Sequence, residues 1–340
     1  MKINKKSIFT FGLSLLFLIL VFHGIDFKRL MDTFSEFNYK MLFAIVPLIL
    51  SAMVLRGVRW KYLLNENKNM SVLELSEIFM VGTALNIYLP ARAGDFFRAY
   101  FLGEKHNRPK LEVIASIVIE RIIDGLTVLF ILFSATCLYY RAGWTFRISE
   151  IAALFFLGSL GTIYFTVKYN KTNQIADYLK KIFSNFQNKT VSILVSAIEK
   201  VRDWINTFLN SASKILETRK LLTAGSISFM IWSIECLIIY ILILGFGINI
   251  HFSAALFVIG FIALASVIPS SSIYIGPFQY AFILALSIYN IDKSSSLAIS
   301  FMLQTVNMLV LTIIFIGFAI KNNLNIVELD KSNIQGPLNE

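Results

Sequence analysis

Apolar residues in this chain are gathered into long runs separated by short polar stretches, a pattern that a water-soluble core does not produce. A helix needs about 20 mostly apolar residues to cross the hydrocarbon core of a bilayer. The pattern therefore predicts an all-α polytopic membrane protein with about eight transmembrane helices. The expected spans are residues 7–22, 41–55, 111–140, 151–167, 221–246, 252–268, 273–290 and 296–320.

A long polar connection separates the fourth and fifth expected spans. Residues 168–220 contain apolar positions at helical spacing between 191 and 216, with charged residues on the opposite face. This pattern is typical of an amphipathic helix lying along a membrane interface, and we expect it to act as a scaffold. The predicted organisation is one transmembrane domain over residues 1–322, which includes this connection, and a short polar tail over residues 323–340.

Composition and charge support the membrane assignment and predict an orientation. The chain is 56% hydrophobic and 15% charged, whereas soluble domains are nearer a quarter charged. The net charge of +10 lies mainly in short connections and around Lys5 and Lys6, which is the bias of cytoplasmic loops rather than a sign of nucleic-acid binding. We expect a multi-pass protein of the cytoplasmic (inner) membrane with both termini cytoplasmic, and an uncleaved signal anchor as its first span.

A segment interrupted by proline and glycine is the first candidate for chemistry. Residues 72–102 are too polar for an ordinary span and too apolar for a loop. Pro90 disfavours helix at the preceding residue, and Gly94 permits close backbone approach. One helix should therefore end near the proline, and a second should begin just after it, at Ala91. The free N–H groups and positive dipole end of this second helix would favour an anion at membrane depth.

Charged residues follow this break at helical spacing. Arg92, Asp95 and Arg98 lie three residues apart on neighbouring turns of one side, and Asn86 belongs to the same candidate group. Ionisable residues at membrane depth cost roughly 2.5–3.5 kcal/mol each on insertion scales, so they are functional candidates by default. We expect Asp95 to hold one arginine while the other stays available for a phosphate. The alternative is an interfacial kink whose arginines extend to headgroups without selecting any.

A second charged group lies inside the third expected span. Glu120, Arg121 and Asp124 are three or four residues apart, roughly a dozen Å into the helix at about 1.5 Å per residue. This group is net acidic and needs a cationic partner, for which Arg92 and Arg98 are the nearest candidates along the chain. The competing interpretation is an internally compensated structural cluster in the core of the bundle.

A second interrupted segment lies near the C-terminal end of the chain. Two prolines, one glycine and four serines interrupt residues 266–279, which predicts a broken or re-entrant helix buried in protein or lining a cavity. Residues 94–102 align with 276–284 at a glycine, a phenylalanine, an alanine and a leucine. Paired Gly/Pro-interrupted segments in two halves indicate the central site of a transporter. The candidates in this segment are Pro269, Ser271, Gly276 and Gln279.

These motifs resemble the lysylphosphatidylglycerol synthase transmembrane region, a flippase-like family that includes the membrane half of bacterial multiple-peptide-resistance factors. The resemblance covers residues from about 7 to 320. It rests on Asn-x-x-x-Pro-Ala-Arg-Ala-Gly-Asp-x-x-Arg, Glu-Arg-x-x-Asp, Arg-x-x-Arg-Trp and the later Pro-Ser…Gly-x-Phe element. It implies transfer of phospholipids or lipid-linked sugars between leaflets. The central site that it implies comprises Asn86, Pro90, Arg92, Gly94, Asp95, Arg98, Glu120, Arg121 and Asp124, and the third motif adds Arg56 and Arg59 as candidates.

The chain departs from the family pattern in two respects. Serines replace a glycine-rich run in the later element, and Gln279 stands where the family usually has an acid, so substrate or ion coupling is expected to differ. The cytoplasmic domain that transfers lysine from charged tRNA is not found in this sequence. We therefore do not expect lysyl transfer by this chain alone.

Three functions of different classes follow from these features. The leading one is a flippase-like transporter of an anionic phospholipid or lipid-linked sugar. A non-transporting accessory subunit of an envelope lipid or glycan pathway, working with a partner enzyme, is the second. An integral-membrane lipid-modifying transferase is the third, although the three histidines lie far apart and no HExxH motif or nucleophile elbow occurs. We expect no enzymatic activity, no catalytic residue, no metal, no cofactor and no nucleic-acid partner.

Overall fold

The computed structural model is built from helices, and no strand occurs among the residues that it describes. These are residues 16–322 apart from 18, 65–69, 90–91, 140–146, 148–149, 152–153, 155–156, 160, 163–164, 167, 170–198, 200–201, 212, 214–217 and 267–275. The elements that carry the fold are α2 (Phe27–Ser35), η1 (Tyr39–Met41), α3 (Leu42–Leu63), α4 (Val72–Tyr88), α5 (Ala93–His106), α6 (Lys110–Tyr139), α10 (Thr218–Gly245), α11 (Ser253–Ala265), α12 (Pro277–Ser287) and α13 (Lys293–Lys321).

Long apolar helices confirm the prediction of an all-α membrane protein. Within the described ranges, the helices long and apolar enough to cross a membrane are Tyr39–Leu63, Lys110–Tyr139, Arg219–Gly245 and Lys293–Lys321. They match the predicted second, third, fifth and eighth spans. The second is longer than predicted because its helix continues through Arg56, Arg59 and Trp60, which lie on the bundle side of α3.

Two predicted spans are corrected by the structure. Residues 252–268 and 273–290 were expected to cross the membrane separately, but their helices α11 and α12 have only 13 and 11 residues. The apolar runs are long enough, yet α11 ends at Ala265 and α12 begins only at Pro277, a residue that favours a helix start. The number of eight spans is therefore not confirmed. The predicted first span and the 168–220 connection lie largely outside the described residues, and the 323–340 tail lies wholly outside them. The predicted fourth span is described only in separate short pieces.

The first predicted break is present between α4 and α5. α4 ends at Tyr88, and Leu89 has extended backbone angles, φ −104° and ψ 144°. α5 begins at Ala93 rather than at Ala91, preceded by Arg92 in the left-handed region at φ 55° and ψ 42°. The proline at position 90 lies outside the described residues. This segment therefore forms two helices, of 17 and 14 residues, that pack against each other.

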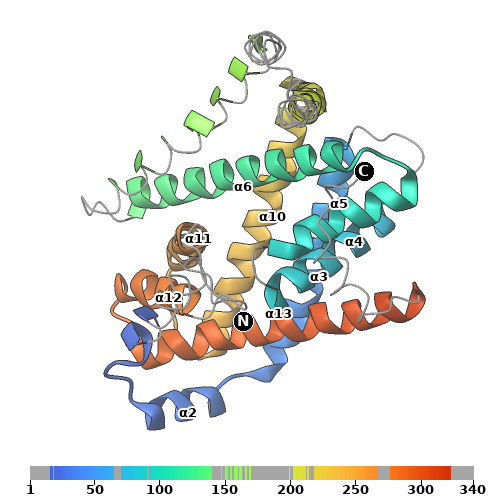
Figure 1. The fold of residues 1–340 in the computed structure, drawn as a ribbon. Helices are drawn as coiled ribbons and strands as arrows, with labels where there is room; N and C mark the ends of the chain where they lie inside the picture. The colour runs from blue at the N-terminus through green and yellow to red at the C-terminus, as the bar shows by residue number, and fades with distance from the viewer. Residues whose placement is uncertain are drawn as a thin grey trace, which may run out of the picture.

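The helices pack in the same order in two halves of the chain. In the first half α4 packs on α5 and α5 on α6, and in the second half α11 packs on α12 and α12 on α13. The halves also exchange contacts, because α4 packs on α13 and α11 packs on α6. In Figure 1, α6 crosses the upper part of α10 from right to left, and α13 crosses near its lower end from left to right. The shared packing order and the opposite directions of the two long helices are features expected of inverted repeats, which many transporters contain.

α3 and α10 form the contact between the two halves. They are antiparallel, because Arg56 binds Glu235 at 2.8 Å while Arg59 donates to Ser228, which is earlier on α10. The backbone N–H of Asn38, just before η1, donates to the carbonyl of Gly245 at the end of α10. These two long helices are therefore tied together by the Arg56 and Arg59 contacts and, at one end, by the Asn38 hydrogen bond.

The start of α13 is held by a polar cap. Asp292 accepts hydrogen bonds from the backbone N–H and the hydroxyl of Ser295 and forms an ion pair with Arg29 of α2 at 2.9 Å. Burial alone would raise the pKa of Asp292, but these hydrogen bonds and the Arg29 charge hold it below its usual range. The contact therefore adds stability above the pKa of an unfolded aspartate, about 3.9, and loses it as the pH falls.

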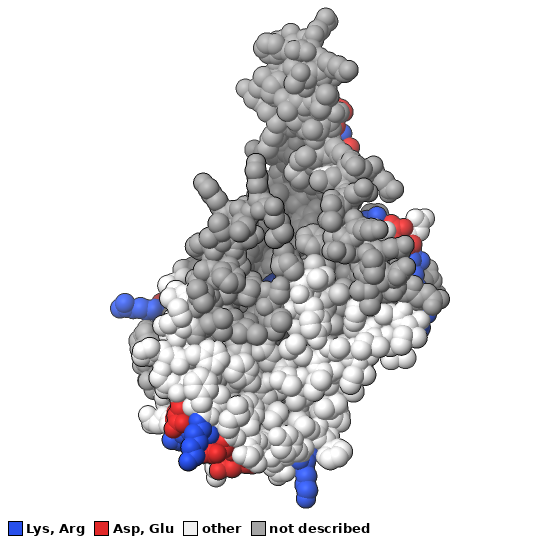
Figure 2. Space-filling view, turned by 60° about the horizontal axis from the view of Figure 1, so that its bottom comes forward, with Lys and Arg blue, Asp and Glu red and all other residues white. Residues whose placement is uncertain are grey.

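One face of the molecule is almost free of charge. In Figure 2 the described part of this surface is white over most of its area, and the acidic and basic residues lie around its edges. Large apolar side chains such as Phe43, Leu309 and Ile313 are exposed on the long helices. Such a surface is suited to lipid rather than to water.

Candidate functional site

A network of charged side chains lies where α3, α5, α6 and α10 meet. It contains three arginines and three carboxylates from the predicted motifs, so it is neutral overall. The members are Arg59 from α3, Asp95 and Arg98 from α5, and Glu120, Arg121 and Asp124 from α6. The structure thus brings together most of the charged residues that the sequence singled out.

Glu120 is the fully buried centre of this network. Its two carboxylate oxygens accept hydrogen bonds from Arg98 at 2.8 and 3.4 Å, and Arg59 forms a second ion pair with it at 3.4 Å. The Arg98 guanidinium also lies 4.2 Å from the ring centre of Trp60 and 4.3 Å from that of Phe79. Buried charges are tolerated when they are paired in this way.

Asp124 joins the network to α10. Arg59 donates to both of its carboxylate oxygens, one of them at 3.0 Å, and the indole N–H of Trp232 donates to it at 2.9 Å. Arg59 also donates to the hydroxyl of Ser228 at 2.6 Å. Three helices are therefore fixed together through one carboxylate.

Asp95 joins the network to the break between α4 and α5. Arg121 donates to both oxygens of Asp95 at 2.9 and 3.1 Å, and the side-chain amide of Asn86 donates to it at 3.1 Å. Arg98 lies 3.7 Å away as a weaker ionic partner. Each of the three network carboxylates is therefore in contact with at least one arginine.

The prediction of cationic partners for the acidic residues is partly confirmed. Arg98 does pair with Glu120 as predicted, whereas Arg92 does not contact the network. The other partner is Arg59, which the sequence identified only through the Arg-x-x-Arg-Trp motif. Ser228, Trp232 and Glu235 of α10 were missed, although Glu235 is an isolated acid inside an apolar run and could have been noticed for that reason.

Gly94 allows α4 and α5 to cross closely. A Cβ atom at Gly94 would lie 1.8 Å from the backbone oxygen of Gly82 and 2.9 Å from the backbone nitrogen of Asn86. The predicted reason for this glycine, close backbone approach, is therefore confirmed. This crossing sets the distance from Asn86 to Asp95.

We expect Gly94→Ala to destabilise the protein by roughly 1–3 kcal/mol, because the backbone of α4 must move to admit the methyl group. Gly225→Ala on α10 is the matched control, since a Cβ there meets nothing within 4 Å and alanine favours helix. Thermal unfolding in detergent measures both. Equal melting temperatures for Gly94→Ala and the wild type would contradict this account of the crossing.

Arg92 lies apart from the network, between the two breaks. Its terminal nitrogen Nη2 donates to the backbone carbonyl of Ser266, just after the end of α11, at 3.2 Å. No ion pair joins Arg92 to a carboxylate anywhere in the described ranges. Asp95 was expected to hold one arginine of the first motif, but its main partner is Arg121. Arg98 is fully buried in the network, and Arg92 lies outside it, so the availability of Arg92 for an anion stays a prediction.

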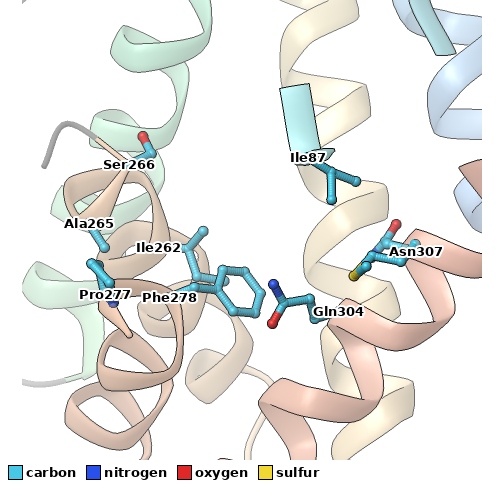
Figure 3. A pocket seen from close by; sticks show the side chains of 9 residues that line it. Ile87, Ile262, Ala265, Ser266, Pro277, Phe278, Gln304 and Asn307 are labelled. Atoms are coloured by element: carbon cyan, nitrogen blue, oxygen red, sulfur yellow. The ribbon is translucent and has the colours of Figure 1, made fainter. Parts of the chain in front are cut away.

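A cavity of about 230 Å³ opens beside this contact. Its lining residues come from α4, α11, α12 and α13, and Ser266, Gln304 and Asn307 are its polar members (Figure 3). The lining residues are Ile87 of α4; Ile262, Ala265 and Ser266 at the end of α11; Pro277 and Phe278 of α12; and Gln304, Asn307 and Met308 of α13. Both interrupted segments therefore border one mostly apolar space.

The second break contributes an amide cluster beside this cavity. Gln279 accepts a hydrogen bond from the backbone N–H of Gly276 at 2.7 Å and donates to Gln304 at 2.5 Å. The position where the family usually has an acid is thus filled here by a buried amide that pairs with another amide. Pro269 and Ser271, which were predicted for this site, lie outside the described residues.

Comparison with known proteins agrees with this architecture. Two proteins named UPF0104 membrane protein from Methanocaldococcus jannaschii are 26% and 25% identical to the chain, over 92% and 63% of its length and 94% and 84% of their own. The glycosyltransferase AglD of Haloferax volcanii is 30% identical over 34% of the chain and 19% of its own length. No solved structure matches. The family model described as "Lysylphosphatidylglycerol synthase TM region" matches residues 7–314, and the chain therefore belongs to this family.

Proposed function

We propose that this protein is a flippase-like transporter that moves an anionic phospholipid or a lipid-linked sugar phosphate between the leaflets of the cytoplasmic membrane. The observation that carries the proposal is Arg92, which has no carboxylate partner in the described structure and lies between two broken helices at the edge of an apolar cavity. A phosphate provides the negatively charged partner that the Arg92 guanidinium does not have among the described residues. The cavity beside it accepts the first part of the lipid chain.

Helix geometry around Arg92 also favours an anion. α5 begins one residue after Arg92, so the unpaired N–H groups of its first turn lie close to this side chain. The positive end of the helix dipole adds to the arginine charge. Interrupted helices with their N-terminal ends near the membrane interior are a recurrent feature of transporter sites.

The neighbouring charge network supports transport rather than catalysis. Its three carboxylates are all bound to arginines and are not free to act as general acids or bases. We propose that this network holds α3, α5, α6 and α10 as a rigid wall, while the substrate passes along the side that carries Arg92. The proposal needs no cofactor, and it keeps both termini on the cytoplasmic side.

Filling the cavity tests its role directly. We expect Ile262→Trp, which adds an indole to the cavity wall, to reduce translocation of a fluorescent phosphatidylglycerol analogue in proteoliposomes at least tenfold. Ile313→Trp is the matched control, because Ile313 of α13 is 69% exposed on the apolar surface. Gel filtration confirms that both variants are folded. Equal translocation by the two variants would contradict the cavity as the lipid path.

A second candidate function is supported by the similarity to AglD, which is named a glycosyltransferase. The match covers only 19% of the length of AglD. On this alternative, the chain is a membrane module that presents a lipid-linked sugar to a separate enzyme. Such a module would bind its lipid without moving it. Co-purification with one enzyme, together with no translocation in proteoliposomes, is the result that favours it.

A further inference from the structure

α4 and α13 form the wall of the cavity that faces the lipid. Ile87 of α4 and Met308 of α13 line the cavity from within. Leu309 and Ile313 of α13 lie on the outer side of the same wall and are 59% and 69% exposed. The two helices pack against each other. A lipid that enters the cavity through this wall therefore has to pass between α4 and α13.

A hydrogen bond closes the wall at the end of α4. The hydroxyl oxygens of Tyr88 and Thr312 are 2.6 Å apart. Thr312 donates its hydroxyl hydrogen to the backbone carbonyl of Met308 at 2.6 Å, and a hydroxyl has one hydrogen to donate, so Tyr88 is the donor to Thr312. Tyr88 directly follows Ile87 of the cavity lining and is 41% exposed. The pair therefore lies between the cavity and the surrounding lipid.

The contacts between α4 and α13 change in kind along the two helices. At the end far from the cavity, Glu77 and Lys321 form an ion pair at 2.8 Å. In the middle, apolar side chains of both helices pack in one buried cluster that includes Ala84 and Leu311. At the cavity, the contact is the neutral and partly exposed hydrogen bond of Tyr88. This end can therefore open while the other contacts stay in place.

The backbone next to Tyr88 is suited to such a movement. Tyr88 is the last residue of α4, and Leu89 already has extended backbone angles. Hinges are commonly a few residues at the ends of secondary-structure elements. The end of α4 can therefore move away from α13 without a break inside the helix.

We propose that Tyr88 and Thr312 form a gate between α4 and α13, through which a lipid enters the cavity from the bilayer. The gate is closed while the hydrogen bond is present. The inference rests on the proposed function, because it assigns the entry route to the same cavity. In Figure 3, Ile87 and Asn307 lie on the side of the cavity away from Ser266. A lipid that has passed the gate can thus extend across the cavity toward the Arg92 contact with Ser266.

A reversible crosslink across the gate tests the proposal. Tyr88→Cys/Thr312→Cys is prepared in a chain whose Cys137 and Cys236 are replaced by alanine. A short bis-methanethiosulfonate reagent joins the two cysteines in nanodiscs before photoactivatable phosphatidylglycerol is exchanged in. After photolysis, mass spectrometry measures the label on the cavity wall. We expect the crosslink to reduce this label at least tenfold and a reductant to restore it.

The matched control joins the same two helices away from the gate. Glu77→Cys/Lys321→Cys, in the same background, places the crosslink roughly 15 Å along the helices from Tyr88 at about 1.5 Å per residue. We expect this crosslink to leave the label on the cavity wall unchanged. A wild-type cavity wall that is not labelled, or equal labelling before and after the crosslink at the gate, would overturn the proposal.

Tyr88→Phe opens the gate without a crosslink, because it removes the hydroxyl and keeps the ring. We expect the cavity wall to be labelled about two- to tenfold faster, since the open state loses one competing hydrogen bond. Tyr62→Phe, at a 51% exposed position near the end of α3, should label at the wild-type rate. Labelling of Tyr88→Phe at or below the wild-type rate would contradict the role of this hydrogen bond.

Translocation measured on the same proteins separates the two proposals. Labelling that the crosslink at the gate blocks, in a protein that does not move lipid between leaflets, would refute the proposed function alone. Translocation that continues at the wild-type rate with this crosslink in place would refute the gate alone.

Discussion

Glu120→Gln is expected to destabilise the protein by about 3–5 kcal/mol, the usual effect of removing one partner from a buried ion pair. Glu120 is fully buried and is in contact with both Arg98 and Arg59. Without it the neutral network gains a net positive charge that water cannot solvate. For a domain of this size the loss corresponds to a melting temperature lower by roughly 6–20 °C, measured by thermal unfolding in detergent.

Two further variants separate this effect from a general loss of charge. Glu77→Gln removes an acid whose partner Lys321 is mostly exposed, and we expect a change below about 1 kcal/mol. The double variant Arg98→Gln/Glu120→Gln restores neutrality and should recover part of the stability. If Glu77→Gln and Glu120→Gln have the same melting temperature, or if the double variant is less stable than either single variant, charge balance in the network does not stabilise the protein.

Arg92→Ala is expected to reduce binding and translocation of an anionic lipid by roughly 10- to 100-fold. A hydrogen bond to a charged group contributes about 1.5–3 kcal/mol, and each 1.4 kcal/mol is a factor of ten. The free energy of unfolding should change little, because within the described structure the Arg92 side chain donates to one group, the backbone carbonyl of Ser266. Translocation in proteoliposomes and lipid retention in native mass spectrometry measure the two effects.

The backbone of Arg92 calls for a specific control, because its φ of 55° is unfavourable for most residues. Arg92→Asn removes the charge but tolerates the left-handed region, so it should lose transport as fully as Arg92→Ala. Arg29→Ala removes an arginine that is 60% exposed and paired with Asp292 at the start of α13, and it should transport normally. Loss of transport in Arg29→Ala, or retention of transport in Arg92→Asn, would contradict phosphate binding by Arg92.

The broad fold could be predicted because a bilayer imposes its own length on a spanning helix. The four long spans were found from apolar runs alone, and the break after α4 was found from Pro90 and Gly94. The lengths of α11 and α12 were overestimated, although the interruption that separates them was found from the prolines, glycine and serines of residues 266–279. In a membrane, backbone interruptions are tolerated where neighbouring helices cover them, so hydropathy alone does not locate them.

The site could be predicted in its members, but among its pairings only that of Arg98 with Glu120 was predicted. Glu120, Asp124 and Arg98 were recognised because charges at membrane depth are rare. The pairing of Arg59 with Asp124 joins residues 65 positions apart and depends on how α3 packs on α6. No local spacing contains that information. The contact of Arg92 with Ser266 likewise appears only when α11 is placed beside the first break.

Movement of anionic lipids by this protein is tested most directly by measuring translocation by the purified wild type in proteoliposomes. Fluorescent phosphatidylglycerol and phosphatidylcholine analogues are compared by their accessibility to a membrane-impermeant quencher over time. We expect phosphatidylglycerol to move between leaflets at least tenfold faster than in protein-free vesicles, and phosphatidylcholine to move at the protein-free rate. Equal rates for both lipids, with or without protein, would contradict the proposed function.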